Sequence, residues 1–260
     1  MPTRAPASAP PAPEPAVESA GDRTEGAPVD GRKERSSGQI EPRVLELPLS
    51  GFEPALVVLP GGKARKRPLL VAAHGAGGRA EAHCALWNAI IGERGAVLCL
   101  RGKRLRADDD SSYYFPNHHA LRKELVAALA SVRSELADAV DANGVVYAGY
   151  SQGAIMGALV ARQDGATLTR LILIEGGALE WDVPTARAFH RAGGKRVLLV
   201  CGHGGCARAG RRAAQWLVAS GAAARVEHVA GAGHTWGGPV AERLRDTFEW
   251  VIEGDARWQP

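Results

Sequence analysis

The pentapeptide Gly149-Tyr150-Ser151-Gln152-Gly153 decides how this sequence is interpreted. It follows the apolar run Val145–Ala148 and precedes a stretch of helical periodicity, so a strand, a tight turn and a helix are expected in that order. Side chains on either side of the serine would collide in so tight a turn, which explains the flanking glycines. The turn would present the Ser151 hydroxyl at the start of a helix, where backbone N–H groups favour negative charge.

A second glycine-rich segment, His74-Gly75-Ala76-Gly77-Gly78, follows the apolar run Leu69–Ala73. Such a loop can turn a backbone N–H towards the carbonyl oxygen of a substrate. We expect the amides of Ala76 and Gln152 to form an oxyanion hole, and His74 to brace the loop. A phosphate cradle is the alternative, but the glycine patterns of dinucleotide- and nucleotide-binding loops are absent from this sequence.

The third segment, Gly231-Ala232-Gly233-His234-Thr235-Trp236, lies between the last predicted strand and the last predicted helix. A histidine flanked by small residues can bring its imidazole within hydrogen-bond reach of a serine. As general base it would take the hydroxyl proton and return it to the leaving group. We therefore predict Ser151 as nucleophile and His234 as base. A chance pentapeptide in a chain rich in Gly and Ala is the alternative for the serine motif.

Together these three segments resemble the α/β-hydrolase superfamily, and in particular its small esterases, dienelactone hydrolases and polyhydroxyalkanoate depolymerases. The resemblance extends from Val44 to about Gly254. It implies an eight-stranded sheet with an antiparallel second strand. The alternation of strands and helices itself predicts an α/β fold with a mostly parallel sheet flanked by helices, and the lack of any insertion longer than residues 101–117 predicts a minimal cap. The resemblance also implies a triad of serine, acid and histidine.

The acid departs from the common pattern of that superfamily. After the apolar run Val197–Val200 the chain reads Gly202-His203-Gly204-Gly205-Cys206, and Gly205 stands where the resemblance leads us to expect Asp. A variant of the pattern places the acid at the end of the sixth strand, where this chain has Glu175. A charged residue that ends an apolar strand beside two glycines needs a partner.

Glu175 is therefore the predicted acid, and Glu180 and Asp182 are the alternatives. Two further possibilities stay open: a Ser–His dyad without an acid, and a Glu175 that meets only solvent or an arginine.

The remaining strands and helices follow from apolar patterning. Residues 1–43 hold half of the 16 prolines and contain no Leu, Phe, Tyr or Trp, which predicts a disordered tail before a domain over residues 44–260. Further strands are predicted at Val44–Leu49, Pro54–Leu59, Ala96–Leu100, Leu171–Ile174 and Arg225–Val229. Helices are predicted at His118–Val140, Gln152–Arg162, Arg208–Ala219 and Val240–Glu253.

The segment Arg101–Asn117 should overhang the site, because it follows the carboxyl end of a strand. Its aromatic residues Tyr113, Tyr114 and Phe115 are predicted to line a substrate pocket. Its charged residues are expected to neutralise one another on a solvated loop.

The four cysteines form two sequence-neighbouring pairs, Cys84 with Cys99 and Cys201 with Cys206. Disulfides would indicate an extracytoplasmic protein, whereas the N-terminus taken literally indicates a cytoplasmic one. Reduced core cysteines are the other interpretation. A metal site at Cys201, His203 and Cys206 would lack an evident fourth ligand, so no metal is expected.

These observations predict a serine hydrolase that cleaves a carboxylic ester through an acyl-enzyme intermediate, with a thioester or an amide as the alternative bond. No cofactor is expected, and the partner is a small-molecule ester.

The net charge of +4 is spread along the chain and aromatic residues make up only 5%, so no nucleic acid is expected. Apolar runs fall short of the roughly 20 residues of a membrane span. The oligomeric state stays open. The competing hypotheses are an inactive binding protein of the same fold and an interaction protein that uses the proline-rich tail.

Overall fold

The computed structural model describes residues 41–61 and 65–259. The predicted disordered tail therefore lies outside the described residues, except for its last three positions. Arg43, the last of these, already belongs to the first strand, which begins one residue earlier than the sequence pattern indicated.

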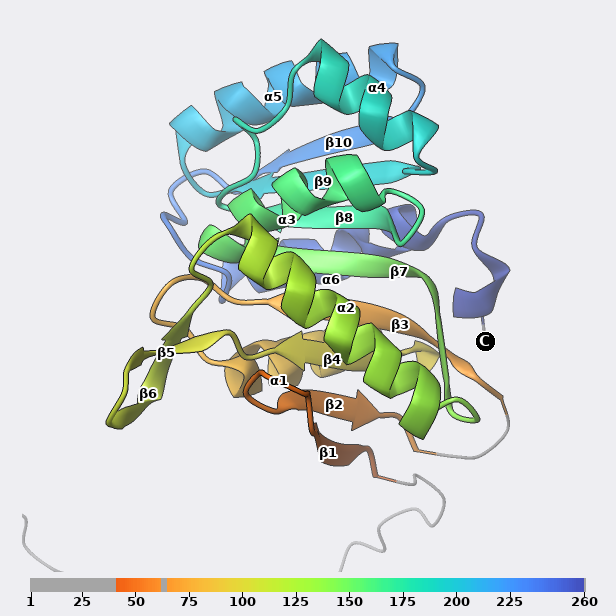
Figure 1. Ribbon diagram of the computed structural model, residues 1–260. Helices are drawn as coiled ribbons and strands as arrows, with labels where there is room; N and C mark the ends of the chain where they lie inside the picture. The colour runs from red at the N-terminus through yellow and green to blue at the C-terminus, as the bar shows by residue number, and fades with distance from the viewer. Residues whose placement is uncertain (1–40, 62–64, 260) are drawn as a thin grey trace, which may run out of the picture. The chain divides into compact units, whose positions relative to one another are not determined.

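An eight-stranded sheet forms the centre of the domain (Figure 1). Its strands are β1 (Arg43–Leu47), β2 (Ala55–Leu59), β3 (Arg67–Ala73), β4 (Ala96–Leu100), β7 (Val140–Tyr150), β8 (Leu168–Ile174), β9 (Arg196–Cys201) and β10 (Ala223–His228). They lie in the order β1-β2-β4-β3-β7-β8-β9-β10. Strand β2 is antiparallel to its neighbours β1 and β4. The other six strands of the sheet, β4, β3, β7, β8, β9 and β10, are mutually parallel. The fold class predicted from the sequence is thereby confirmed.

Helices cover both faces of this sheet. They are α1 (Ala80–Ile91), α2 (His118–Glu135), α3 (Gln152–Asp164), α4 (Val183–Arg191), α5 (Gly204–Ala219) and α6 (Pro239–Ile252). Figure 1 shows α2 to α5 on the near face and α1 and α6 on the far face. Two separate apolar clusters fill the spaces between the sheet and these layers. Burial on both faces explains why the strands read as continuous apolar runs rather than as alternating ones.

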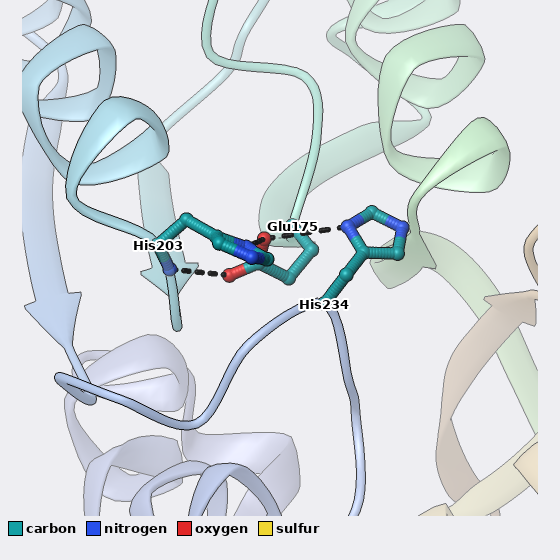
Figure 2. Close-up of side chains that lie close together, drawn as sticks. All are labelled: Glu175, His203 and His234. Carbon is teal, nitrogen blue, oxygen red and sulfur yellow. Dashed lines mark hydrogen bonds and ion pairs between the residues drawn. The ribbon is translucent and has the colours of Figure 1, made fainter. Parts of the chain in front are cut away.

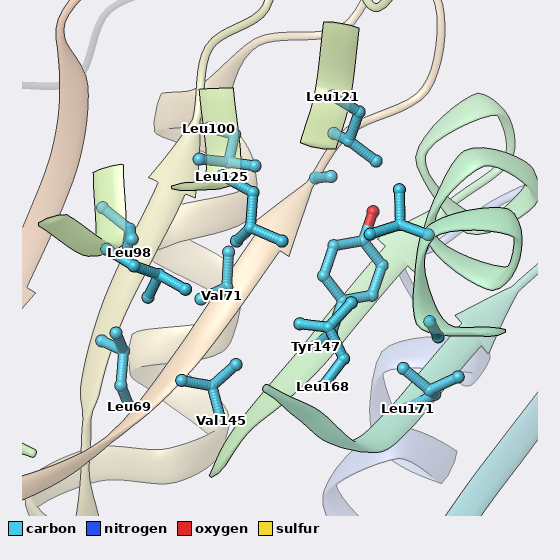
Figure 3. Packing of buried hydrophobic residues seen from close by; sticks show 14 of the residues in the cluster. Leu69, Val71, Leu98, Leu100, Leu121, Leu125, Val145, Tyr147, Leu168 and Leu171 are labelled. Atoms are coloured by element: carbon cyan, nitrogen blue, oxygen red, sulfur yellow. The ribbon is translucent and has the colours of Figure 1, made fainter. Parts of the chain in front are cut away.

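The cluster between the sheet and the helices α2 and α3 takes alternate residues of a strand, such as Leu69 and Val71 (Figure 3). Leu69 and Val71 of β3 point into this cluster, whereas Leu70 between them packs into the cluster on the opposite face. Tyr147 lies fully buried in the first cluster, and its hydroxyl donates to the carbonyl oxygen of Gly153 at 2.7 Å.

Three local features differ from the sequence-based expectation. The helix predicted to reach Val140 ends at Glu135, and Val140 starts β7 instead. The segment expected as a loop contains a hairpin of β5 (Lys103–Arg106) and β6 (Asp109–Tyr114). For helix α4 the sequence predicted only that His190 lies in a helix, without bounds. Within the described residues, no helix combines the length and apolarity needed to cross a bilayer.

All four cysteines form disulfide bonds. Cys84 of α1 is bonded to Cys99 of β4, and Cys201 at the end of β9 is bonded to Cys206 in the first turn of α5. Of the two interpretations left open by the sequence, the structure has the disulfides. Because the sulfurs of Cys201 and Cys206 bond to each other, they cannot be the thiolate ligands of a metal ion.

We predict that Gly157→Ala destabilises the domain. A Cβ at this position of α3 would lie 2.1 Å from the Tyr147 ring, which is fully buried and held by its hydrogen bond. The resulting overpacking should lower the free energy of unfolding by about 1–3 kcal/mol. This loss is larger than the stability gained from the better helix propensity of Ala. Urea denaturation measures this change. Gly205→Ala in α5 is the matched control, since its nearest heavy atom would be 3.9 Å away; equal losses for both variants would contradict the packing argument.

Candidate active site

Ser151 occupies the turn that joins β7 to α3. Its backbone is left-handed, with φ 50° and ψ −114°. A Cβ on Gly149 would lie 2.6 Å from the Ala154 nitrogen, and one on Gly153 would lie 2.4 Å from the Ala73 carbonyl oxygen. The two flanking glycines are therefore required by space, and the serine carries a conformation that costs a non-glycine residue of order 1–3 kcal/mol.

His234 approaches this serine from the loop between β10 and α6. Its Nε2 lies 2.9 Å from Ser151 Oγ. The hydroxyl of Tyr150 donates to the His234 carbonyl oxygen at 3.0 Å, so the residue before the serine also holds the histidine loop. Burial, followed by the charge of Glu175, raises the pKa of Tyr150, which keeps its phenol protonated as a donor.

Glu175 follows β8 and completes the arrangement (Figure 2). Its Oε2 lies 3.4 Å from His234 Nδ1 and 3.0 Å from His203 Nδ1. Its Oε1 accepts hydrogen bonds from the backbone N–H groups of Gly202 and His203. Among the described residues, Glu175 and Ser151 are the two non-glycine positions with positive φ. Backbone strain of this kind concentrates at functional sites.

Solved protein structures resemble this chain over most of its length. Dienelactone hydrolase from Anabaena variabilis matches with a TM-score of 0.59 and 14% identity, over 83% of this chain and 98% of its own. Est1E from Butyrivibrio proteoclasticus matches with a TM-score of 0.57 and 16% identity, over 80% and 98%. The Bacillus cereus carboxylesterase matches with a TM-score of 0.55 and 20% identity, over 75% and 93%.

The chain has the α/β-hydrolase fold. No protein-family model matches it, and no curated protein does either. At the identities above, the likeness concerns the fold, so the chemistry of this α/β-hydrolase-fold protein has to be argued from its own residues.

The glycine-rich loop after β3 lies directly against the serine. A Cβ on Gly75 would be 3.1 Å from Ser151 Cβ, so the absence of a side chain here allows the loop to approach. The loop is also hydrogen-bonded to the backbone of Tyr113. The Gly77 N–H donates to the Tyr113 carbonyl oxygen, and the Tyr113 N–H donates to the Gly78 carbonyl oxygen. In the described part of the chain, neither the Ala76 amide nor the Gln152 amide donates to another protein group, which leaves both available to an oxyanion.

The His74 side chain holds the glycine-rich loop in place. It is fully buried, with Nδ1 2.7 Å from the Gly75 carbonyl oxygen and Nε2 2.8 Å from the Arg101 carbonyl oxygen. Burial lowers the pKa of His74. The backbone N–H groups of Arg101 and Gly102 donate in turn to Glu124 Oε1, both at 2.9 Å. A chain of contacts thus runs from α2 to the loop beside Ser151.

The three aromatic residues expected to line a pocket occupy different surroundings. Tyr113 and Phe115 are buried, with 2% and 1% of their surface exposed. The Phe115 ring packs against His74, and its backbone N–H donates to the side-chain oxygen of Gln152 at 2.8 Å. Tyr114 is half-buried. The segment therefore supports the loop and the helix start through its backbone, and Tyr114 is the member that reaches the surface.

Among the described residues, neither alternative acid forms an ion pair with His234. Asp182 caps helix α4 by accepting from the Thr185 N–H at 2.7 Å, and hydrogen bonds from the side chain and the backbone of Thr185 lower its pKa. Glu180 is half-buried, and burial raises its pKa. Of the three candidates, the structure brings Glu175 to His234.

Three residues with a part in the site were missed from the sequence: Tyr150, Glu124 and His203 in its contact with Glu175. The carboxyl ends of adjacent parallel strands meet at one edge of a sheet. Had β8 and β9 been known to be neighbours, that rule would have placed His203 beside Glu175. The Tyr150 and Glu124 contacts span 84 and 22–23 positions of sequence, and no local pattern marks them.

We predict that Glu124→Gln flattens the pH dependence of stability. Burial raises the pKa of Glu124 from 4.5 to about 7, so the folded protein holds this proton more tightly than the unfolded chain does. The resulting stabilisation is complete below about pH 4.5 and is lost as the pH rises through about 7. Gln keeps an acceptor for the two amides but cannot ionise. The free energy of unfolding, measured in urea at pH 5 and pH 8, should therefore fall less in the variant than in the wild type.

Glu135→Gln, at an exposed position of the same helix, is the control for the Glu124 experiment. An unaltered difference between pH 5 and pH 8 in Glu124→Gln would contradict the assignment.

Proposed function

We propose that this protein is a serine hydrolase that cleaves carboxylic esters through an acyl-enzyme intermediate. The observation that carries the proposal is the 2.9 Å contact between Ser151 Oγ and His234 Nε2, made by a serine in a left-handed turn at the start of a helix. Nucleophile and base within hydrogen-bond reach, with the base oriented by a third group, are the geometric signature of nucleophilic catalysis.

The first half of the proposed reaction forms the acyl-enzyme. His234 Nε2 accepts the hydroxyl proton while Ser151 Oγ bonds to the ester carbonyl carbon, and the carbonyl oxygen becomes an oxyanion. When the tetrahedral intermediate collapses, the bond to the alcohol oxygen breaks. His234 returns its proton to that oxygen, and the alcohol leaves. In the second half, water repeats these steps with the acyl group and releases the carboxylic acid.

The remaining roles follow from position. Glu175 would accept the His234 Nδ1 proton in a hydrogen bond, which holds the tautomer whose Nε2 is free to act as base. Its other oxygen is already fixed by two backbone N–H groups, so the carboxylate is oriented before substrate binds. The Ala76 and Gln152 amides would stabilise the oxyanion, and losing one such donor typically costs about two to three orders of magnitude in rate.

An ester is favoured over an amide for two reasons. The chain contains no additional domain for an extended peptide within its described residues, and half of the His234 side chain is exposed, so small substrates reach it directly. Related folds point the same way, since the neighbours include a dienelactone hydrolase and a carboxylesterase. Est1E has been solved with ferulic acid bound, so aromatic acyl groups belong in the substrate panel.

The two disulfides favour an oxidising compartment as the place of this reaction. Cys84–Cys99 and Cys201–Cys206 account for every cysteine in the chain. Such bonds persist outside the reducing cytosol. We therefore propose that the protein acts outside the cytoplasm.

We predict that Ser151→Ala abolishes hydrolysis of a panel of p-nitrophenyl and feruloyl esters with graded acyl groups. Loss of the nucleophile should lower kcat by about four orders of magnitude or more. Ser134→Ala, at an exposed position of α2, should retain wild-type rates. If no ester of the panel is hydrolysed by the wild type, the competing hypothesis of a non-catalytic binding protein gains; if Ser151→Ala remains active, Ser151 is not the nucleophile.

We predict that Glu175→Gln lowers kcat by about two to four orders of magnitude and changes KM little, because the carboxylate acts on the charge that His234 acquires in the transition state. Glu180→Gln is the matched control, since it removes a neighbouring, half-buried carboxylate. Activity of Glu175→Gln close to the wild type, or a larger loss in Glu180→Gln, would remove Glu175 from the triad.

A further inference from the structure

Glu175, His203 and His234 bring three potential metal ligands together at the edge of the proposed active site (Figure 2). One ligand atom from each residue lies within 4.8 Å of the other two. Glu175 Oε2 is the shared atom, 3.0 Å from His203 Nδ1 and 3.4 Å from His234 Nδ1. The proposed hydrolysis needs only one of these histidines, so the second requires an explanation.

We propose that Glu175, His203 and His234 form a binding site for Zn²⁺ or a similar divalent transition metal, and that metal binding switches the hydrolase off. In tetrahedral zinc sites the bonds to nitrogen and oxygen of about 2.0–2.2 Å place neighbouring ligand atoms about 3.3 Å apart. The two distances from Glu175 Oε2, 3.0 Å and 3.4 Å, lie close to this value. Three protein ligands would leave the fourth position to water.

The Glu175 carboxylate is buried and held in a fixed orientation, as metal-ligating carboxylates are. Its side chain is 2% exposed, and its second oxygen accepts from the Gly202 and His203 amides. Hydrogen bonds of this kind orient ligating groups. The Cys201–Cys206 disulfide closes the loop that carries His203, which limits the movement of that ligand.

The charge at the cluster also favours a cation. Among the described residues, the ion-pair partners of Glu175 are these two histidines, each of which is charged only when protonated. A buried carboxylate without a permanent positive partner is costly, and a divalent ion would supply that charge. The exposed fractions of the His203 and His234 side chains, 55% and 50%, give the ion a route from solvent.

Inhibition follows from the chemistry of imidazole and rests on the proposed function. A metal bound at His234 Nδ1 needs the lone pair of that nitrogen, so the ring proton must sit on Nε2. A protonated Nε2 cannot accept the Ser151 proton. The same metal also removes Glu175 from its hydrogen bond to the base. One binding event would therefore disable both the base and the acid.

The chemistry of the three ligands determines which metal ions the site selects. Two imidazole nitrogens suit Zn²⁺, Cu²⁺ and Ni²⁺, whereas Mg²⁺ and Ca²⁺ prefer sites built from oxygen atoms. We expect Zn²⁺ to inhibit at concentrations at which Mg²⁺ has no effect.

Zinc binding is tested first without reference to activity. Isothermal titration of full-length Ser151→Ala with ZnCl₂ should detect one site, because all three ligands remain. Adding His203→Gln, which keeps a hydrogen-bond donor for Glu175 but removes the imidazole, should weaken binding by roughly tenfold or more. His119→Ala is the control, since His118 and His119, with ring centroids 3.9 Å apart, are another place where zinc could bind. Binding that is unchanged by His203→Gln, or abolished by His119→Ala, would overturn the proposal.

The inhibition test uses ester hydrolysis, with each variant normalised to its own rate in EDTA. Zinc should inhibit the wild type reversibly, and His203→Gln should raise the half-inhibitory concentration by roughly tenfold or more. Equal inhibition of both proteins would overturn the regulatory role. A chain that binds zinc through His203 but hydrolyses no ester would refute the proposed function and leave the metal site standing, so the two failures can be told apart.

Discussion

The left-handed turn at Ser151 is the constraint on which the rest of the site depends. It exists because Gly149 and Gly153 have no side chains where a Cβ would enter the backbone of the following helix or of β3. The same turn places Tyr150 where its hydroxyl can hold the backbone of His234, and brings Gln152 to the start of α3, where its side chain holds Phe115. One sharp reversal of the chain thus positions the serine and helps to position the histidine loop and the segment beside the glycine-rich loop.

A second constraint acts at Glu175, at the end of the neighbouring strand. Gly205 stands where an acid was expected from the resemblance, and the carboxylate beside His234 is that of Glu175, which follows β8 and has φ 51°. The loop after β9 holds this carboxylate in place. Its Gly202 and His203 amides bind Glu175, and the Cys201–Cys206 disulfide ties the loop to α5.

The sequence predicted those parts of the molecule in which local pattern and tertiary environment agree. The central strands were found because they are buried on both faces. The end of α2 was misplaced because Val140 continues the helical spacing of apolar residues and is also buried as the first residue of β7, so periodicity cannot separate the two. The β5–β6 hairpin is largely exposed and polar, so it gives no apolar signal. The second partner of Glu175 depends on the adjacency of two loops that lie 28 positions apart in the chain.

The most direct test of the central claim is to label the protein with a fluorophosphonate and to locate the adduct by peptide mass spectrometry. Our account predicts a single adduct on Ser151, formed rapidly by the wild type and much more slowly by His234→Ala, because the imidazole 2.9 Å away activates the hydroxyl. The absence of any adduct, an adduct on another residue, or labelling that is indifferent to the loss of His234 would contradict it.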